Sequence, residues 1–152
     1  MTETIVIKKK IEDFNKRINI SGDKSLSIRW VLFASLASGV SKSKHLLMSE
    51  DVLAAINAIK KLGIKVKFNK DICEISGMGI DGYKYKKNLT INAENSGTLG
   101  RLILGLLINT PYPIRLIGDK SLSKRDFSRV IKPLKLFGAN IKSIKNSLPV
   151  NI

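Results

Sequence analysis

The spacing of apolar residues along the chain predicts four amphipathic helices. In the first of them Leu26, Trp30, Phe33, Leu36 and Ala37 recur at helical intervals, which would place them on one buried face. Three of the four segments are followed by a glycine, as is common where a helix ends. The predicted helices span residues 25–38, 50–62, 96–108 and 126–137.

Short apolar or alternating runs between these segments predict β-strands. The predicted strands are residues 4–10, 17–20, 45–48, 64–68, 72–76, 89–92, 114–117, 139–144 and 148–152. The order β-α-β-α-β-β therefore occurs about twice. This alternation predicts a mixed α/β (α+β) domain in which helices cover sheets.

The second half of the chain resembles the first in one constant register, which indicates a duplicated unit. The matched positions are Asp51, Ile56, Ile59, Lys60, Leu62, Gly63, Val66 and Lys67 with Asp126, Ile131, Leu134, Lys135, Phe137, Gly138, Ile141 and Lys142. A second likeness does not share this register: Gly22–Arg29 and Gly118–Arg125 differ at one position. This second likeness indicates either two similar anion-facing loops or chance.

The charge of the chain favours anionic ligands. Its 152 residues contain 27 lysines and arginines against 12 acidic residues, a formal net charge of +15. Such a balance suits phosphorylated small molecules, nucleic acid or an anionic membrane surface. The lysines are scattered through nearly every segment, and neither a long basic block nor an aromatic-plus-basic RNA-binding signature appears, so we expect neither nucleic acid nor a membrane as the partner.

Cysteine and histidine are too scarce in this chain for the usual Cys/His metal sites. Cys73 is the single cysteine and His45 the single histidine, so neither an internal disulfide nor a Cys/His metal cluster is expected. Cys73 falls in an apolar strand-like run, which indicates packing. Neither a signal peptide nor an apolar run of membrane-spanning length is recognisable, and we predict a cytoplasmic protein.

Three polar turns precede predicted helices and carry the candidate chemistry. The first, Ser21–Arg29, offers Lys24, Ser25 and Arg29 beside a helix N-terminus, where free N–H groups and the helix dipole attract anions. In the second, Asn95 is a candidate helix cap and Gly97 allows a ligand to approach the backbone, with Arg101 on the same helical face.

The third turn, Asp119–Arg125, ends in an arginine whose planar guanidinium fits a carboxylate or phosphate. A solvated helix start is the plain alternative for each turn taken alone. Three such turns in one chain favour a shared anion site.

With these turns, the sequence resembles the N-terminal part of the 5-enolpyruvylshikimate-3-phosphate synthase family, the 3-phosphoshikimate 1-carboxyvinyltransferases. Ser21–Arg29 follows the family pattern Pro-Gly-Asp-Lys-Ser-Ile/Leu-Ser/Thr-x-Arg, with serine in place of proline. Glu94–Arg101 follows Gly-Asn-Ala/Ser-Gly-Thr-x-x-Arg with Glu94 in place of the first glycine. Gly118–Asp126 follows a Gly-Asp/Glu-x-Ser pattern that ends Arg-Pro, with Asp126 in place of the proline. The stretch Asp51–Gly63 resembles a further family helix.

The resemblance implies transfer of the enolpyruvyl group from phosphoenolpyruvate to the 5-hydroxyl of shikimate 3-phosphate, with release of phosphate and without a metal or organic cofactor. It implies that Lys24 contacts phosphoenolpyruvate, and that Ser25 and Arg29 bind shikimate 3-phosphate. Gly97 would line the phosphoenolpyruvate pocket and Arg125 would bind its anionic groups. Asn95 and Thr98 would flank that pocket.

The resemblance also implies the alpha-beta prism fold of the enolpyruvyl transferases, with about two of the usual six units present. Residues 1–20 would cross to the other domain. Residues 21–152 would form an incomplete first domain of two units, roughly 21–83 and 84–152. Family members are monomers nearly three times as long, so we expect a truncated form that is inactive alone.

Other functions stay open at this point. One is the related transferase that acts on UDP-N-acetylglucosamine, although that family usually carries Gly-Ala-Lys-Asn where this chain has Gly22-Asp23-Lys24-Ser25. Another is a basic RNA-binding module, and a third is a gene fragment without present function. Protection from heat by shikimate 3-phosphate or by a short RNA would distinguish the enzyme family from the RNA-binding module.

Overall fold

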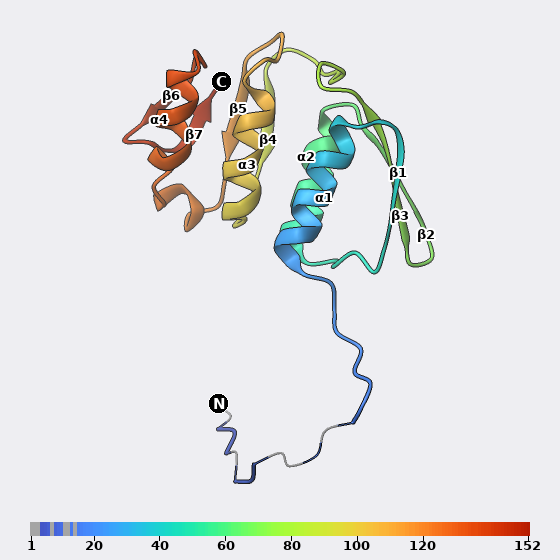
Figure 1. Ribbon diagram of the computed structural model, residues 1–152. Coiled ribbons are helices and arrows are strands. Elements are labelled where there is room, and N and C mark those ends of the chain that lie inside the picture. The colour runs from blue at the N-terminus through green and yellow to red at the C-terminus, as the bar shows by residue number, and fades with distance from the viewer. Residues whose placement is uncertain (1–3, 7, 11–12, 14) are drawn as a thin grey trace.

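The computed structural model describes residues 4–6, 8–10, 13 and 15–152, and shows two units that each combine a β-sheet with two α-helices (Figure 1). The first unit contains α1 (Lys24–Leu36), β1 (Ser38–Lys44), α2 (Glu50–Lys61), β2 (Lys65–Asn69) and β3 (Ile72–Met78). The second contains β4 (Leu89–Asn92), α3 (Gly97–Leu107), β5 (Ile114–Ile117), the 3-10 turn η1 (Leu122–Lys124), α4 (Ser128–Leu136), β6 (Lys142–Ile144) and β7 (Ser147–Asn151). The mixed α/β fold class is confirmed.

The two sheets have corresponding strand orders. The first is antiparallel with the order β1-β3-β2, and the second has the order β4-β5-β7-β6. In the second sheet β4 pairs parallel to β5, and the remaining pairs are antiparallel. The series β1-β3-β2 thus matches β5-β7-β6, while β4 has no counterpart in the part of the first unit that the structure describes.

The backbone repeats in the register that the sequence indicates. Gly63 and Gly138 end corresponding helices with φ angles of 90° and 91°. Lys70 and Lys145 occupy corresponding hairpin turns with φ angles of 53° and 51°. A glycine suits the first pair of positions because residues with a Cβ adopt positive φ only at an energetic cost. The duplication is therefore visible in the backbone as well as in the sequence.

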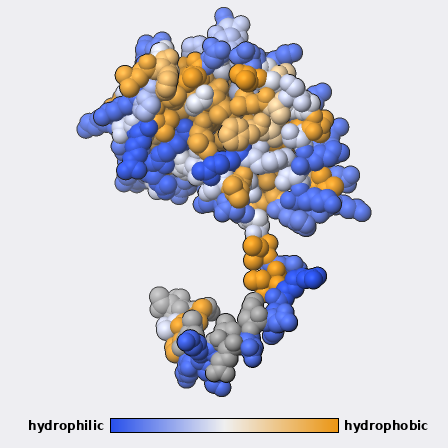
Figure 2. All heavy atoms as spheres, viewed as in Figure 1, coloured by the Kyte–Doolittle hydropathy of each residue, from blue (hydrophilic) through white to orange (hydrophobic). Residues whose placement is uncertain are grey.

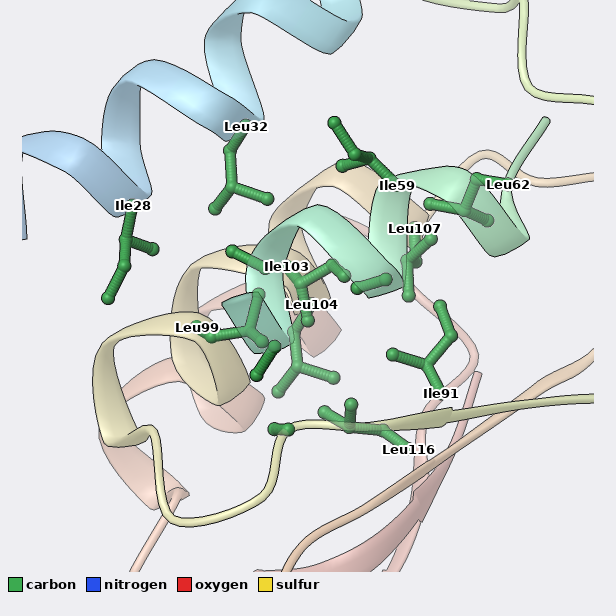
Figure 3. Close-up of a cluster of buried hydrophobic side chains, with 14 of the residues drawn as sticks. Ile28, Leu32, Ile59, Leu62, Ile91, Leu99, Ile103, Leu104, Leu107 and Leu116 are labelled. Carbon is green, nitrogen blue, oxygen red and sulfur yellow. The ribbon is translucent and has the colours of Figure 1, made fainter. Parts of the chain in front are cut away.

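One hydrophobic core joins the two units (Figure 3). Side chains from α1, α2, β4, α3 and β5 meet there, and most of them are fully buried. Burying an aliphatic side chain of this size contributes about 1.5–3 kcal/mol. The labelled members are Ile28, Leu32, Ile59, Leu62, Ile91, Leu99, Ile103, Leu104, Leu107 and Leu116. This shared core fixes the relative position of the helix N-termini that form the site below.

Three strand predictions are wrong. Residues 17–20, 45–48 and the described residues of 4–10 are not strands, whereas the polar segment Ser38–Lys44 is strand β1. A strand forms where a partner can accept its hydrogen bonds, and β1 pairs along its whole length with β3. Ile18 and Ile20 are exposed and have no such partner in the described part of the chain.

The buried face of α1 also differs from the prediction. Leu26 and Phe33 are 66% and 67% exposed, and Ile28, Val31 and Leu32 are buried instead. Apolar residues surround this helix on nearly every side, so periodicity alone did not determine which face packs inward. Several large apolar side chains of the described residues are exposed, and Figure 2 shows a hydrophobic area in the middle of the view.

Candidate anion-binding site

Asp23 caps the N-terminus of α1. Its Oδ1 accepts a hydrogen bond of 2.7 Å from the backbone N–H of Leu26, and its carbonyl accepts one of 3.0 Å from Ser27. Lys24 is thereby the first residue of the helix. The sequence placed Ser25 at the helix N-terminus, and the structure moves the cap two residues earlier. A cap of this kind stabilises a helix by about 1 kcal/mol.

Ser96, not Asn95, caps the N-terminus of α3. The Ser96 hydroxyl accepts a hydrogen bond of 3.3 Å from the N–H of Leu99. The prediction that Asn95 acts as the cap is therefore wrong. Asn95 instead accepts a hydrogen bond of 2.8 Å from Nη2 of Arg125, so its side chain faces the third polar turn. The same residue thus serves the site by orienting an arginine.

The third turn is tied to the start of α3. The N–H of Asp119 donates a hydrogen bond of 2.8 Å to the carbonyl of Glu94, and Asp119 Oδ1 accepts one of 2.6 Å from the N–H of Leu122. The chain leaves η1 at Arg125 in an extended conformation, with ψ of 148°. These bonds hold the third turn against the segment that precedes α3, next to the Arg125 side chain.

Gly97 makes room for two guanidinium groups. A Cβ at this position would lie 2.8 Å from Nη1 of Arg101 and 3.1 Å from Nη1 of Arg125. Arg101 donates hydrogen bonds to the carbonyls of Gly97 (3.3 Å) and Asp126 (3.1 Å), and its guanidinium lies 5.0 Å from the centre of the Phe127 ring. Arg101 therefore joins α3 to the segment that carries Arg125.

These segments border an open cleft of about 380 Å³. Its lining comes from the N-terminal ends of α1, α2 and α3 and from the third turn: Lys24, Glu50, Asp51, Asn95, Gly97, Thr98, Arg101 and Arg125. Three of these residues are cationic and two are acidic, which leaves a net charge of +1. Helix N-termini add a partial positive charge, so the cleft suits an anion.

Five of the seven sequence-predicted site residues line this cleft: Lys24, Asn95, Gly97, Thr98 and Arg125. Ser25 and Arg29 do not line it. Arg29 borders a smaller groove of about 80 Å³ with apolar side chains of α1 and α3. Arg125 also borders an open depression of about 620 Å³, which Lys120 and Lys124 line as well.

Asp51 is a cleft residue that the sequence did not single out as functional. Its Oδ2 lies 3.0 Å from Nζ of Lys24, and the two side chains are 22% and 52% exposed. The sequence signal was limited to its place in the first turn of the second predicted helix. The approach of α2 to α1 depends on tertiary packing, which the sequence pattern does not report.

Other reactive groups lie outside the cleft. The Cys73 thiol is buried, and burial raises its pKa above the ordinary value of 9.0. Burial also raises the pKa of Tyr83 above 10.0, while a hydrogen bond of 2.8 Å with Ser35 opposes that shift.

Within the described residues, groups of three or more His, Cys, Asp or Glu side chains that could hold a metal ion are absent. None of the helices in this part of the chain is long and apolar enough to cross a membrane.

The fold and the cleft together define a class: an α/β protein of repeated units in which helix N-termini, a lysine and two arginines line one cleft. Residues 8–152 match the family described as EPSP synthase (3-phosphoshikimate 1-carboxyvinyltransferase). The chain belongs to this family, and the resemblance drawn from its motifs is confirmed. Its fold is the inside-out α/β prism of that family.

Individual relatives agree with this membership. The chain is 40% identical over 135 residues to the 3-phosphoshikimate 1-carboxyvinyltransferase of Streptococcus suis (strain 98HAH33), covering 89% of this chain and 32% of that protein. It is 43% identical over 136 residues to that of Ruthia magnifica subsp. Calyptogena magnifica, covering 89% and 31%. The solved EPSP synthase from Acinetobacter baumannii superposes with a TM-score of 0.82 at 36% identity, over 89% of this chain and 31% of that chain. This chain thus spans about a third of the length of these relatives.

Proposed function

We propose that this chain contributes the first anion-binding half-site of an enolpyruvyl transferase. The reaction transfers the enolpyruvyl group of phosphoenolpyruvate to the 5-hydroxyl of shikimate 3-phosphate and releases phosphate. The observation that carries the proposal is the cleft in which Lys24, Arg101 and Arg125 meet three helix N-termini, within a chain of this family. Two anions must be brought together for this reaction, so fixed cations and N–H groups lower its barrier.

The residues of the cleft receive separate roles in this proposal. Lys24 contacts phosphoenolpyruvate, and Arg125 binds its anionic groups from the opposite wall. Gly97 supports this assignment because its missing side chain leaves the guanidinium of Arg125 beside the backbone. Asn95 orients Arg125 through the hydrogen bond described above, and Thr98 lines the same pocket.

Ser25 and Arg29 are proposed to bind shikimate 3-phosphate. Both are on α1 next to Lys24, but neither lines the cleft that contains Lys24 and Arg125. Arg29 is exposed on the helix surface, where a second anion can reach it. In this arrangement the two substrates occupy neighbouring positions on either side of the first turn of α1.

We further propose the division of the chain that the family resemblance implies. Residues 1–20 reach toward another domain, and residues 21–152 form two units of the first domain, roughly 21–83 and 84–152. The single buried cysteine suits a reducing cytoplasm. The complete enzyme would act as a monomer without a metal or organic cofactor.

The 152 residues alone are expected to bind substrate without turnover. They contain no Ser-Ser-Gln segment like the later substrate loop of the family. The family resemblance implies that the acid/base carboxylate lies in a later part of the longer enzymes, and this chain spans 32% of the length of one such relative. In this proposal the chain therefore binds substrate but does not catalyse the transfer.

Calorimetric titration of the chain with phosphoenolpyruvate and shikimate 3-phosphate tests the proposal, with melting curves and a phosphate-release assay run alongside. A ligand at ten times its Kd would stabilise the fold by about 1.4 kcal/mol, which for a chain of this size raises the Tm by about 3–6 °C. We expect stabilisation by one or both substrates but no release of phosphate. UDP-N-acetylglucosamine and a short RNA serve as controls that should leave the Tm unchanged.

Binding and turnover can each contradict the proposal. A folded chain that binds neither substrate would exclude the assigned half-site, and stabilisation by RNA in physiological salt would favour the basic RNA-binding alternative. Release of phosphate by the 152 residues alone would overturn the separation of binding from turnover.

A further inference from the structure

The ion pair between Lys24 and Asp51 connects two helices at the wall of the cleft. Lys24 is the first residue of α1, and Asp51 belongs to the first turn of α2. Their charged atoms are 3.0 Å apart, and both residues line the cleft. A partly exposed pair of this kind adds little to the stability of a fold, so stability alone does not account for it.

The repeated unit shows what an aspartate at this position does elsewhere. Asp126 is the counterpart of Asp51 in the duplicated sequence. Asp126 bonds to its own helix start, because its Oδ1 accepts a hydrogen bond of 2.8 Å from the N–H of Ser128. Asp51 instead extends across to Lys24 on another helix. Equivalent aspartates therefore make a local contact in one unit and an interhelical contact in the other.

Attraction of an anionic ligand does not explain why Asp51 lies at this cleft. A carboxylate on the wall of an anion-binding cleft repels the ligand, so its presence needs another reason. Lysine has a long flexible side chain, and an unrestrained ammonium would sample many positions before an anion arrives. Asp51 sits on the rigid first turn of α2, where the helix dipole favours a negative charge.

We propose that Asp51 is a positioning residue that holds the Lys24 ammonium at the cleft and thereby raises the affinity for the anion. The inference rests on the proposed function of the cleft. Asp51 itself makes no contact with the anion in this scheme. Its effect is pre-organisation of a cation, which lowers the entropy lost on binding.

A double-mutant cycle tests this role, with phosphoenolpyruvate as the probe and titration calorimetry as the measurement. Asp51→Asn keeps the shape of the side chain but removes its charge, and we expect it to weaken binding about tenfold. In a Lys24→Met background the same change should have no effect. Asp51→Glu should restore part of the affinity, because its carboxylate can again reach Lys24.

The sign of the effect separates positioning from repulsion. Unchanged or tighter binding in Asp51→Asn would overturn the inference, and so would an equal loss in the presence and absence of Lys24. Glu74→Gln is the matched control, since it breaks an ion pair of 2.8 Å with Lys42 that lies on the first sheet away from the cleft. This control should leave the affinity unchanged.

A ligand-free measurement distinguishes failure of this inference from failure of the proposed function. Lysines labelled with ¹³C at Cε give NMR signals, and the Lys24 signal is identified by its loss in Lys24→Arg. We expect Asp51→Asn to increase the mobility of Lys24 Cε while leaving Lys42 unchanged. If the wild-type chain bound no phosphoenolpyruvate but Lys24 were mobilised, the proposed function would fail and the positioning contact would stand. Unchanged mobility of Lys24 would overturn the inference.

Discussion

Gly22–Arg29 and Gly118–Arg125 differ at one residue, and both begin with the same hydrogen bonds. Asp23 and Asp119 accept bonds of 2.7 Å and 2.6 Å from the N–H groups three residues later. Their carbonyls accept bonds of 3.0 Å and 2.9 Å from the residues four positions later. The first segment then continues as the 13-residue helix α1, while the second ends after the three-residue turn η1.

The one residue at which the two segments differ shows why the first continues as a helix and the second does not. Ile28 is fully buried in the shared core, whereas Lys124 is exposed at the end of η1. A helix start is therefore specified locally by its cap, but its continuation requires that the following residues bury an apolar face. The arginines that end the two segments consequently differ in position. Arg29 stays on a helix surface, and Arg125 extends to Asn95 in the cleft.

Exchanging the differing residue gives the largest expected effect. Ile28→Lys makes the first segment identical to the second, and it places a charge in the core, so we expect a loss of more than about 4 kcal/mol in the free energy of unfolding. Lys124→Ile makes the second segment identical to the first at an exposed position, and we expect a change within about 0.5 kcal/mol. Urea unfolding followed by circular dichroism measures both. A similar effect of the two substitutions would show that burial does not separate the segments.

The two arginines should differ in the ligand that they affect. Arg125→Ala removes a charged hydrogen-bonding group, which costs about 1.5–3 kcal/mol, and should weaken phosphoenolpyruvate binding about ten- to a hundredfold. Arg29→Ala should leave phosphoenolpyruvate binding unchanged and weaken shikimate 3-phosphate binding. Calorimetric titration of both variants with both ligands checks these roles. Equal losses for one ligand in both variants would mean that the arginines share a single site.

Removing the side chains of Asp23 and Asp119 should separate the stability of a helix from the geometry of the cleft. Asp23→Ala and Asp119→Ala should each cost about 1 kcal/mol of stability. Only Asp23→Ala should also reduce the helical circular dichroism signal, because α1 is long and η1 is a single turn. Asp119→Ala should weaken phosphoenolpyruvate binding by loosening the turn that carries Arg125. The matching asparagine variants keep a capping oxygen and should behave like the wild type.

The smallest expected effect concerns acid pH. Hydrogen bonds from the hydroxyl and the N–H of Ser128 lower the pKa of Asp126 below its ordinary value of 3.8. Its folded-state pKa is depressed, so its contribution to stability is present above the ordinary pKa and is lost as the pH falls through the folded-state pKa. Melting curves between about pH 6 and about pH 2.5 should show a smaller loss in Asp126→Asn than in the wild type. An identical pH dependence would exclude this contribution.

Local sequence was sufficient for features that depend on few neighbours. Strands β4 and β5 lie where alternation placed them, and the helices lie within a few residues of their predicted bounds. The sequence predicted that Gly63 and Gly138 end corresponding helices, and both do so at positive φ. The three polar turns were also visible in the sequence, and the structure brings residues of all three to one cleft.

Tertiary structure decided the features that depend on contacts between distant segments. The polar segment Ser38–Lys44 became strand β1 because β3 lies beside it, and the inward face of α1 was selected by packing against α2, β3 and α3. The predicted cap Asn95 instead accepts a hydrogen bond from Arg125, and Ser96 caps α3. The pairing of Asp51 with Lys24 likewise exists only because two helix N-termini meet, and a linear sequence contains no record of that distance.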